Sequence, residues 1–189
     1  MTVNVTDPKP SNFNLPNALT AVRIIFIPVF AWLVLKADGH QTSWMWWSFV
    51  CFILMMFTDK LDGDIARARG IVTDFGKIAD PIADKALMIT ALVCLNLVGL
   101  LPWWITTVIV VRELGITFWR MAELRRGRVV PASKGGKFKT ALQTCAIALY
   151  LVPVPSFMAI LQLIVMLVAT LVTVVTGIQY LIDARRVNA

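Results

Sequence analysis

Six long apolar segments, separated by short polar turns, make up most of the chain. A helix needs about 20 residues to cross the hydrocarbon core of a bilayer, and each segment is long enough if some tilt is allowed. The pattern predicts an all-α integral membrane bundle of six transmembrane helices in a single domain, residues 1–189, with residues 1–16 as an N-terminal tail and short interfacial segment. The predicted helices cover residues 17–36, 44–68, 76–99, 102–126, 137–154 and 157–183.

The composition agrees with a membrane protein. Hydrophobic residues make up 58% of the 189 positions and charged residues only 15%, whereas soluble domains carry about 25% charged residues. The net charge of +7 does not indicate nucleic acid as a partner, because no stretch alternates basic and aromatic residues. The three cysteines each lie alone in an apolar segment at spacings that match no metal site, so we interpret them as small hydrophobic residues.

The basic residues predict the orientation of the helices. Lys and Arg are concentrated in the turns 67–77 and 120–139 and near the C-terminus, and they are absent from the turns 37–43, 99–102 and 153–156. Cytoplasmic loops of membrane proteins carry an excess of Lys and Arg. We therefore expect a multi-pass protein of the cell membrane with both termini, and the two basic turns, in the cytoplasm.

Four aspartates interrupt this apolar background. Asp59 and Asp62 fall in the cytoplasmic half of the second segment, and Asp80 and Asp84 in that of the third. Residues three or four apart share a helix face, so each pair forms one stripe, and the short turn between the two segments allows the stripes to meet. Ionisable residues inside a membrane segment are costly and usually mark a functional site.

The chemistry of this cluster indicates a metal site. It offers only carboxylate oxygens, which suit Mg²⁺, Mn²⁺ or Ca²⁺ rather than zinc. Four carboxylates are enough for two ions, and two-metal sites typically serve phosphoryl displacement. Gly63 and Ala66 leave room on the same face, and Arg67 is placed to bind a phosphate. On spacing alone, a proton or cation transporter is the alternative.

The spacing also resembles the signature of the CDP-alcohol phosphotransferases. In this chain it reads Asp59-x-x-Asp62-Gly63-x-x-Ala66-Arg67, eight residues, Gly76, three residues, Asp80, three residues, Asp84. The segment number and chain length fit that family too, so the resemblance covers essentially the whole chain. It implies transfer of a phosphatidyl-type group from a CDP-linked lipid to an alcohol, with release of CMP. The orientation predicted from the basic residues makes the active site face the cytoplasm.

The resemblance also implies roles for individual residues. Two Mg²⁺ or Mn²⁺ ions would be bound by Asp59, Asp62 and Asp80, with Asp84 as the general base and a further metal ligand. A homodimer is implied as well. The residues implied to bind the CDP-lipid are Asn17, Thr20, Gly63, Ala66, Arg67 and Gly76.

A second polar cluster concerns the acceptor. Arg112 interrupts the apolar fourth segment, and Arg120 follows two turns later on roughly the same side. The run 130–140 then brings hydroxyls and lysines to the start of the fifth helix, a position that favours anions. Such a pocket favours an alcohol that carries a phosphate. The predicted acceptor residues are Arg112, Arg120, Ser133, Lys137, Lys139 and Thr140.

The Arg112-Glu113 pair and the run 130–140 resemble the phosphatidylglycerophosphate synthase subfamily. This resemblance implies that CDP-diacylglycerol and sn-glycerol 3-phosphate are the substrates and that phosphatidylglycerophosphate and CMP are the products. A phosphatidylinositol phosphate synthase, which also needs a cationic acceptor pocket, is the alternative within the family. A divalent cation transporter is a more remote one.

Overall fold

The computed structural model describes residues 14–68, 70–71, 73–125 and 134–187. These residues form α-helices and one short 3-10 helix, with no β-strand among them, so the all-α prediction is confirmed. The predicted helix limits differ from those observed by a few residues. The elements are α1 (Leu15–Ala37), α2 (Thr42–Ala68), α3 (Asp74–Leu97), α4 (Trp103–Arg125), α5 (Lys134–Leu151), η1 (Ser156–Met158) and α6 (Ala159–Val187).

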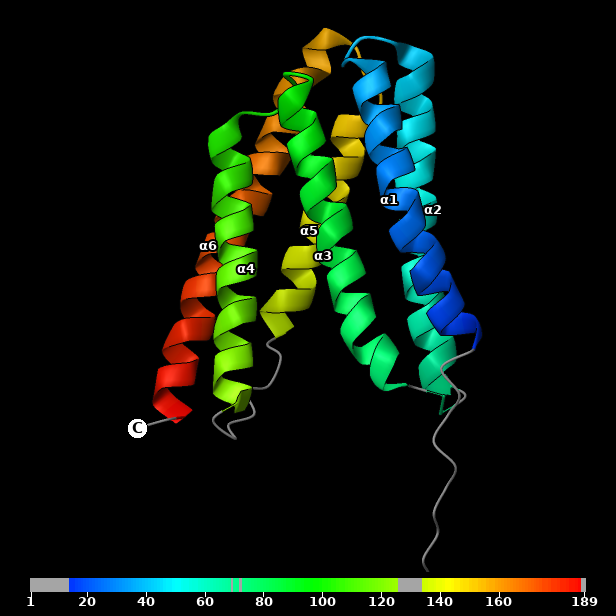
Figure 1. Cartoon of the computed structure of the whole chain (residues 1–189). Helices are drawn as coiled ribbons and strands as arrows, with labels where there is room; N and C mark the ends of the chain where they lie inside the picture. Colours follow the sequence, from blue (N-terminus) through cyan, green and yellow to red (C-terminus); the bar gives the residue numbers. More distant parts are fainter. Residues whose placement is uncertain (1–13, 69, 72, 126–133, 188–189) are drawn as a thin grey trace, which may run out of the picture.

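The helices run alternately in opposite directions along one bundle. The start of α1, the end of α6 and the connection between α2 and α3 therefore lie at the same end (Figure 1). We call this the aspartate end, because Asp59, Asp62, Asp80 and Asp84 lie in the parts of α2 and α3 nearest to it.

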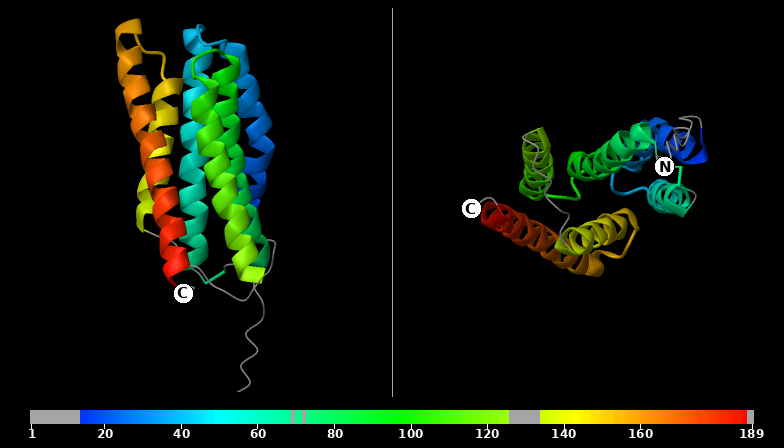
Figure 2. Two further views of the ribbon diagram at one scale, coloured as in Figure 1. Left: turned by 90° about the vertical axis from the view of Figure 1, so that its left-hand side faces the viewer. Right: turned by 90° about the horizontal axis from the view of Figure 1, so that it is seen from below.

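Two groups of three helices make up the bundle. α1 packs along α2 and α3, and α6 packs along α4 and α5. The groups meet where α2 contacts α5 and where α3 contacts α4 and α5. Seen from the aspartate end, the two groups lie side by side (Figure 2). Fully buried apolar side chains such as Phe30, Phe52 and Ile147 fill the part of the bundle farther from the aspartates.

Local sequence explains where the two helices at the aspartate cluster begin. The Asn14 side chain caps α1 by accepting a hydrogen bond from the Asn17 N–H at 2.9 Å. The Thr73 hydroxyl caps α3 by accepting one from the Gly76 N–H at 3.0 Å. Asn and Thr are favoured at this position because they satisfy an N–H group that has no partner within the helix.

Part of the bundle surface is suited to lipid. Within the described residues, two helical stretches are long and apolar enough to cross a membrane: Leu15–Ala37, with mean hydropathy 2.3, and Ala159–Ile182, with mean hydropathy 2.5. Large apolar side chains such as Ile25, Val111 and Leu171 are exposed on the outside of the bundle, as in a protein that meets lipid or a partner there. A membrane bundle fits these features, while the six spans, the topology and the single domain stay predictions.

Candidate active site

The aspartates of α2 receive their closest partner from α1. Arg23 donates hydrogen bonds to both Asp59 and Asp62. Arg23 and Asp62 are almost completely buried, each with 2% of its surface exposed. One turn earlier on α1, the Thr20 hydroxyl donates to Asp80 Oδ1 at 2.6 Å. One face of α1 therefore binds carboxylates of both α2 and α3.

The four predicted aspartates interact electrostatically across α2 and α3. Asp59 lies within electrostatic reach of Asp62, Asp80 and Asp84. Among the described residues, no three or more His, Cys, Asp or Glu side chains are arranged to hold a metal ion. The Arg23 guanidinium instead lies where two of the carboxylates would share a cation. The oxygen-only donor set suits a hard divalent ion, and metal binding here stays a prediction.

Asn17 and Gly76 have a structural role that the sequence did not indicate. The Thr73 hydroxyl donates to Asn17 Oδ1 at 3.0 Å, which ties the start of α3 to α1. A Cβ atom at Gly76 would lie 3.0 Å from Asn17 Oδ1 and 3.3 Å from Thr73 Oγ1. Glycine thus permits the close packing that brings the aspartates of α3 to α1. The binding of the CDP-lipid by Asn17 and Gly76 stays a prediction.

The other residues predicted to bind the CDP-lipid lie on the last turns of α2. Arg67 is exposed and forms an ion pair with Asp64 at 2.8 Å. Its guanidinium lies over Gly63, because a Cβ there would be 3.1 Å from Arg67 Nη2. Ala66 is half-buried, and its carbonyl oxygen accepts a hydrogen bond from the Ile71 N–H. The space beside Gly63 is therefore filled by a flexible cation that a phosphate could attract.

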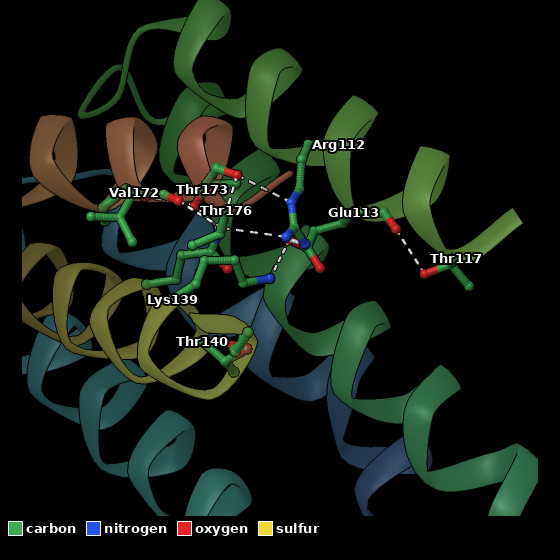
Figure 3. Close-up of polar contacts among 11 residues, drawn as sticks. Arg112, Glu113, Thr117, Lys139, Thr140, Val172, Thr173 and Thr176 are labelled. Carbon is green, nitrogen blue, oxygen red and sulfur yellow. Dashed lines mark hydrogen bonds and ion pairs between the residues drawn. The ribbon is translucent and has the colours of Figure 1, made fainter. Parts of the chain in front are cut away.

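A second polar cluster joins α4, α5 and α6 (Figure 3). Arg112 donates from Nε to the Thr173 carbonyl oxygen at 3.1 Å and from Nη2 to Thr176 Oγ1 at 3.4 Å. Its Nη1 donates to Glu113 Oε1 at 3.1 Å, and the same oxygen accepts from Lys139 Nζ. Glu113 therefore holds two cations from different helices close together and partly neutralises them.

Gly177 makes room for this arginine. A Cβ atom at Gly177 would lie 3.1 Å from both Cγ and Nε of Arg112. Thr173, Thr176, Gly177 and Tyr180 are spaced three or four residues apart, so they form one stripe on the otherwise apolar α6. This stripe is the surface against which Arg112 lies.

A cavity of about 880 Å³ connects the two clusters. It opens between α2, α4, α5 and α6, and Asp59 and Lys60 contribute to it from the carboxylate side. Asp84 lies close by, because it borders a small adjoining space together with Lys139 and Thr140. The polar residues that line the cavity are Asp59, Lys60, Arg112, Arg120, Lys139, Thr140, Thr144 and Tyr180.

Four of the six residues predicted for the acceptor line this cavity, namely Arg112, Arg120, Lys139 and Thr140. Ser133 lies outside the described residues, as does the side chain of Lys137. The Thr140 hydroxyl donates to the Gly136 carbonyl oxygen at 3.1 Å. The structure thus brings the described acceptor candidates together, while their binding role stays a prediction.

Sequence reasoning assigned no role to several residues at these clusters. Arg23 follows Thr20 by three residues, and this spacing could have indicated that it faces the carboxylates with Thr20. The polar stripe of α6 shows the same spacing within an apolar helix. Lys60 gave no signal of its own, because its place at the cavity depends on how α2 packs against α5.

Residues 13–175 match the family model described as CDP-alcohol phosphatidyltransferase. A protein of Mycobacterium tuberculosis named "Probable phosphatidylglycerophosphate synthase" is 43% identical over 173 residues, which cover 92% of this chain and 82% of that protein. In Bacillus subtilis, a protein named CDP-diacylglycerol–glycerol-3-phosphate 3-phosphatidyltransferase is 37% identical over 145 residues, 72% of this chain and 75% of the relative. A protein of the same name from Haemophilus influenzae is 34% identical over 177 residues, 89% of this chain and 92% of the relative.

Proposed function

The chain belongs to the CDP-alcohol phosphatidyltransferase family, and from this membership we propose that it transfers a phosphatidyl group from CDP-diacylglycerol to sn-glycerol 3-phosphate. The products are phosphatidylglycerophosphate and CMP, which makes the protein a transferase of phospholipid biosynthesis. The names of the relatives from Bacillus subtilis and Haemophilus influenzae support this pair of substrates.

The cavity between the aspartates and the cations of α4 and α5 is the observation that carries the proposal. Arg112, Arg120 and Lys139 line one part of it and Asp59 another. Guanidinium and ammonium groups bind phosphate through charge-assisted hydrogen bonds. A phosphorylated acceptor bound to these cations would direct its free hydroxyl towards the aspartate cluster, where the family resemblance puts the donor pyrophosphate.

For the donor, we propose that Asp59, Asp62, Asp80 and Asp84 hold two divalent ions, Mg²⁺ or Mn²⁺. Such ions neutralise a pyrophosphate and the charge that develops on CMP as it leaves. Arg23 binds one oxygen of Asp59 and one of Asp62, so an ion would use the other oxygens of these carboxylates or take the place of the guanidinium. Asn17, Thr20, Gly63, Ala66, Arg67 and Gly76 are the proposed contacts of the CDP-lipid.

The proposed reaction is an in-line displacement at the phosphorus that carries the diacylglycerol. The acceptor hydroxyl oxygen forms a new P–O bond while the P–O bond to CMP breaks. Its proton passes to the carboxylate of Asp84. No covalent enzyme intermediate is proposed, because the acceptor hydroxyl itself attacks the phosphorus. Most of the rate enhancement should come from positioning and electrostatics.

We also propose that all six helices cross the cell membrane and that the aspartate end faces the cytoplasm, with the protein acting as a homodimer. The start of α1 and the end of α6 lie at the same end of the bundle, as an even number of spans requires (Figure 1). The basic turns next to that end agree with the usual excess of Lys and Arg in cytoplasmic loops. Single cysteines placed in the turn 37–43 and near the C-terminus would test the orientation. They would be labelled from either side of sealed vesicles.

Asp62→Asn tests the proposed activity. Asparagine keeps the size of the side chain and a carbonyl oxygen for Arg23, so the variant should fold but lose CMP release from CDP-diacylglycerol and glycerol 3-phosphate. Asp38→Asn is the matched control, because Asp38 caps α1 at the opposite end with φ 47°, a conformation that asparagine tolerates. Retained activity in purified Asp62→Asn would refute the active site, and a preference for inositol phosphate would refute the acceptor.

A further inference from the structure

Tyr180 has a buried hydroxyl group without a partner. Only 8% of the residue is exposed, and its Oη makes no hydrogen bond to any of the described residues. Buried tyrosine hydroxyls usually find a hydrogen-bond partner, because leaving one unpaired costs free energy. Because Tyr180 borders a cavity, its hydroxyl is available to hydrogen-bond a ligand that binds there.

The position of the Tyr180 side chain is fixed by its neighbours. Its ring packs edge-on against Trp119 of α4, with ring centroids 5.7 Å apart and an angle of 87° between the planes. Tyr180 lines the 880 Å³ cavity together with Arg112 and Arg120. Its hydroxyl lies within electrostatic reach of both guanidinium groups.

The backbone of α6 couples Tyr180 to Arg112. Tyr180 is one turn beyond Thr176 and Gly177, the residues that bind and accommodate Arg112. The same face of one helix therefore positions the arginine and the tyrosine. Any ligand that reaches the guanidinium of Arg112 from the cavity comes close to this part of α6.

The chemistry of these three groups specifies the kind of ligand. Arg112 and Arg120 can only donate hydrogen bonds, and a neutral tyrosine hydroxyl beside them is best used as a third donor. A phosphate has several oxygens that accept such bonds at once, and hydrogen bonds to an anionic oxygen are stronger than those between neutral groups. We infer that Tyr180 donates its hydroxyl hydrogen bond to the phosphate of the acceptor. This contact rests on the proposed function and makes Tyr180 a specificity-determining residue for it.

The Tyr180→Phe variant tests the inference, because it removes the hydroxyl and keeps the ring against Trp119. The KM for glycerol 3-phosphate should rise about tenfold or more, which corresponds to at least about 1.4 kcal/mol. The inhibition constant of inorganic phosphate as a competitor should rise by a similar factor. The KM for CDP-diacylglycerol and kcat should stay within about twofold of the wild type.

Tyr150→Phe is the matched control, since Tyr150 is the other of the two tyrosines and lies in the apolar core on α5. It should leave both KM values unchanged. The inference would be overturned if Tyr180→Phe kept the wild-type KM for glycerol 3-phosphate. It would also be overturned if this KM rose while the inhibition constant of inorganic phosphate did not change. A wild-type protein that releases no CMP with glycerol 3-phosphate would instead refute the proposed function, and the inference with it.

Discussion

Replacing Gly177 by alanine should displace Arg112. The new Cβ atom would lie 3.1 Å from both Cγ and Nε of the arginine, whereas ordinary contacts begin at about 3.4 Å. The Nε atom also donates to the Thr173 carbonyl oxygen, and Nη2 to Thr176 Oγ1, both on the same helix as Gly177. The side chain of Arg112 cannot move away from α6 without lengthening at least one of these bonds, so its guanidinium should shift within the cavity.

Two effects of opposite sign decide what the Gly177→Ala variant shows. Alanine is favoured over glycine in a helix interior by about 0.5–1 kcal/mol, so the free energy of unfolding should change little or rise. A hydrogen bond to a charged group is worth about 1.5–3 kcal/mol. If the displaced Arg112 loses one such bond to the acceptor phosphate, the KM for glycerol 3-phosphate should rise about 10- to 100-fold.

The assay is steady-state CMP release at saturating CDP-diacylglycerol with glycerol 3-phosphate varied, together with thermal unfolding in detergent. Gly115→Ala on α4 is the control, because a Cβ there would meet nothing within 4 Å. It gains the same helix propensity without displacing a neighbour, and it should keep the wild-type KM. Equal KM values for the two variants would refute the reasoning. A large loss of thermal stability in Gly177→Ala alone would also refute it, since α6 rather than Arg112 would then have moved.

Two further predictions concern the carboxylate cluster. Arg23→Gln should lower the free energy of unfolding by about 3–5 kcal/mol, because it leaves Asp62 buried without its cation. Thermal unfolding should show a smaller loss of stability with Mg²⁺ than with a chelator. Equal losses of stability under the two conditions would contradict metal binding at these aspartates. Removal of divalent ions with EDTA should abolish CMP release and added Mg²⁺ or Mn²⁺ should restore it, so full activity in EDTA would refute the metal requirement.

The helices and the two aspartate stripes were predictable from sequence for a simple reason. Apolar segments of about 20 residues leave few alternatives to a helix in a membrane, because every backbone polar group must be satisfied within the segment. The spacing of Asp59 and Asp62, and of Asp80 and Asp84, then fixes their common faces without knowledge of the fold. Helix ends were less predictable, since α3 begins where Thr73 caps it and not where the apolar run begins.

The partners of these residues were not predictable to the same degree. A helical sequence shows which residues share a face, but it does not show which other helix that face meets. Arg112 and Thr173 are 61 residues apart, and their contact exists only because α6 packs against α4. Arg23 and Asp62 are likewise 39 residues apart. The role of Gly177 depends on the same packing, because this glycine leaves space for the Arg112 side chain of α4.

The two polar clusters follow one electrostatic rule, and that rule limits how tightly ligands can bind. Each cluster contains its own counter-charge: Arg23 for Asp59 and Asp62, and Glu113 for Arg112 and Lys139. A buried charge without a partner costs several kcal/mol, so removing one member of these pairs would destabilise the fold. A cation that binds the aspartates, or a phosphate that binds Arg112 and Lys139, competes with these internal partners for the same side chains. The contacts that stabilise the aspartate end therefore lower its affinity for ligands, and a ligand gains only the difference between the new interactions and the old ones.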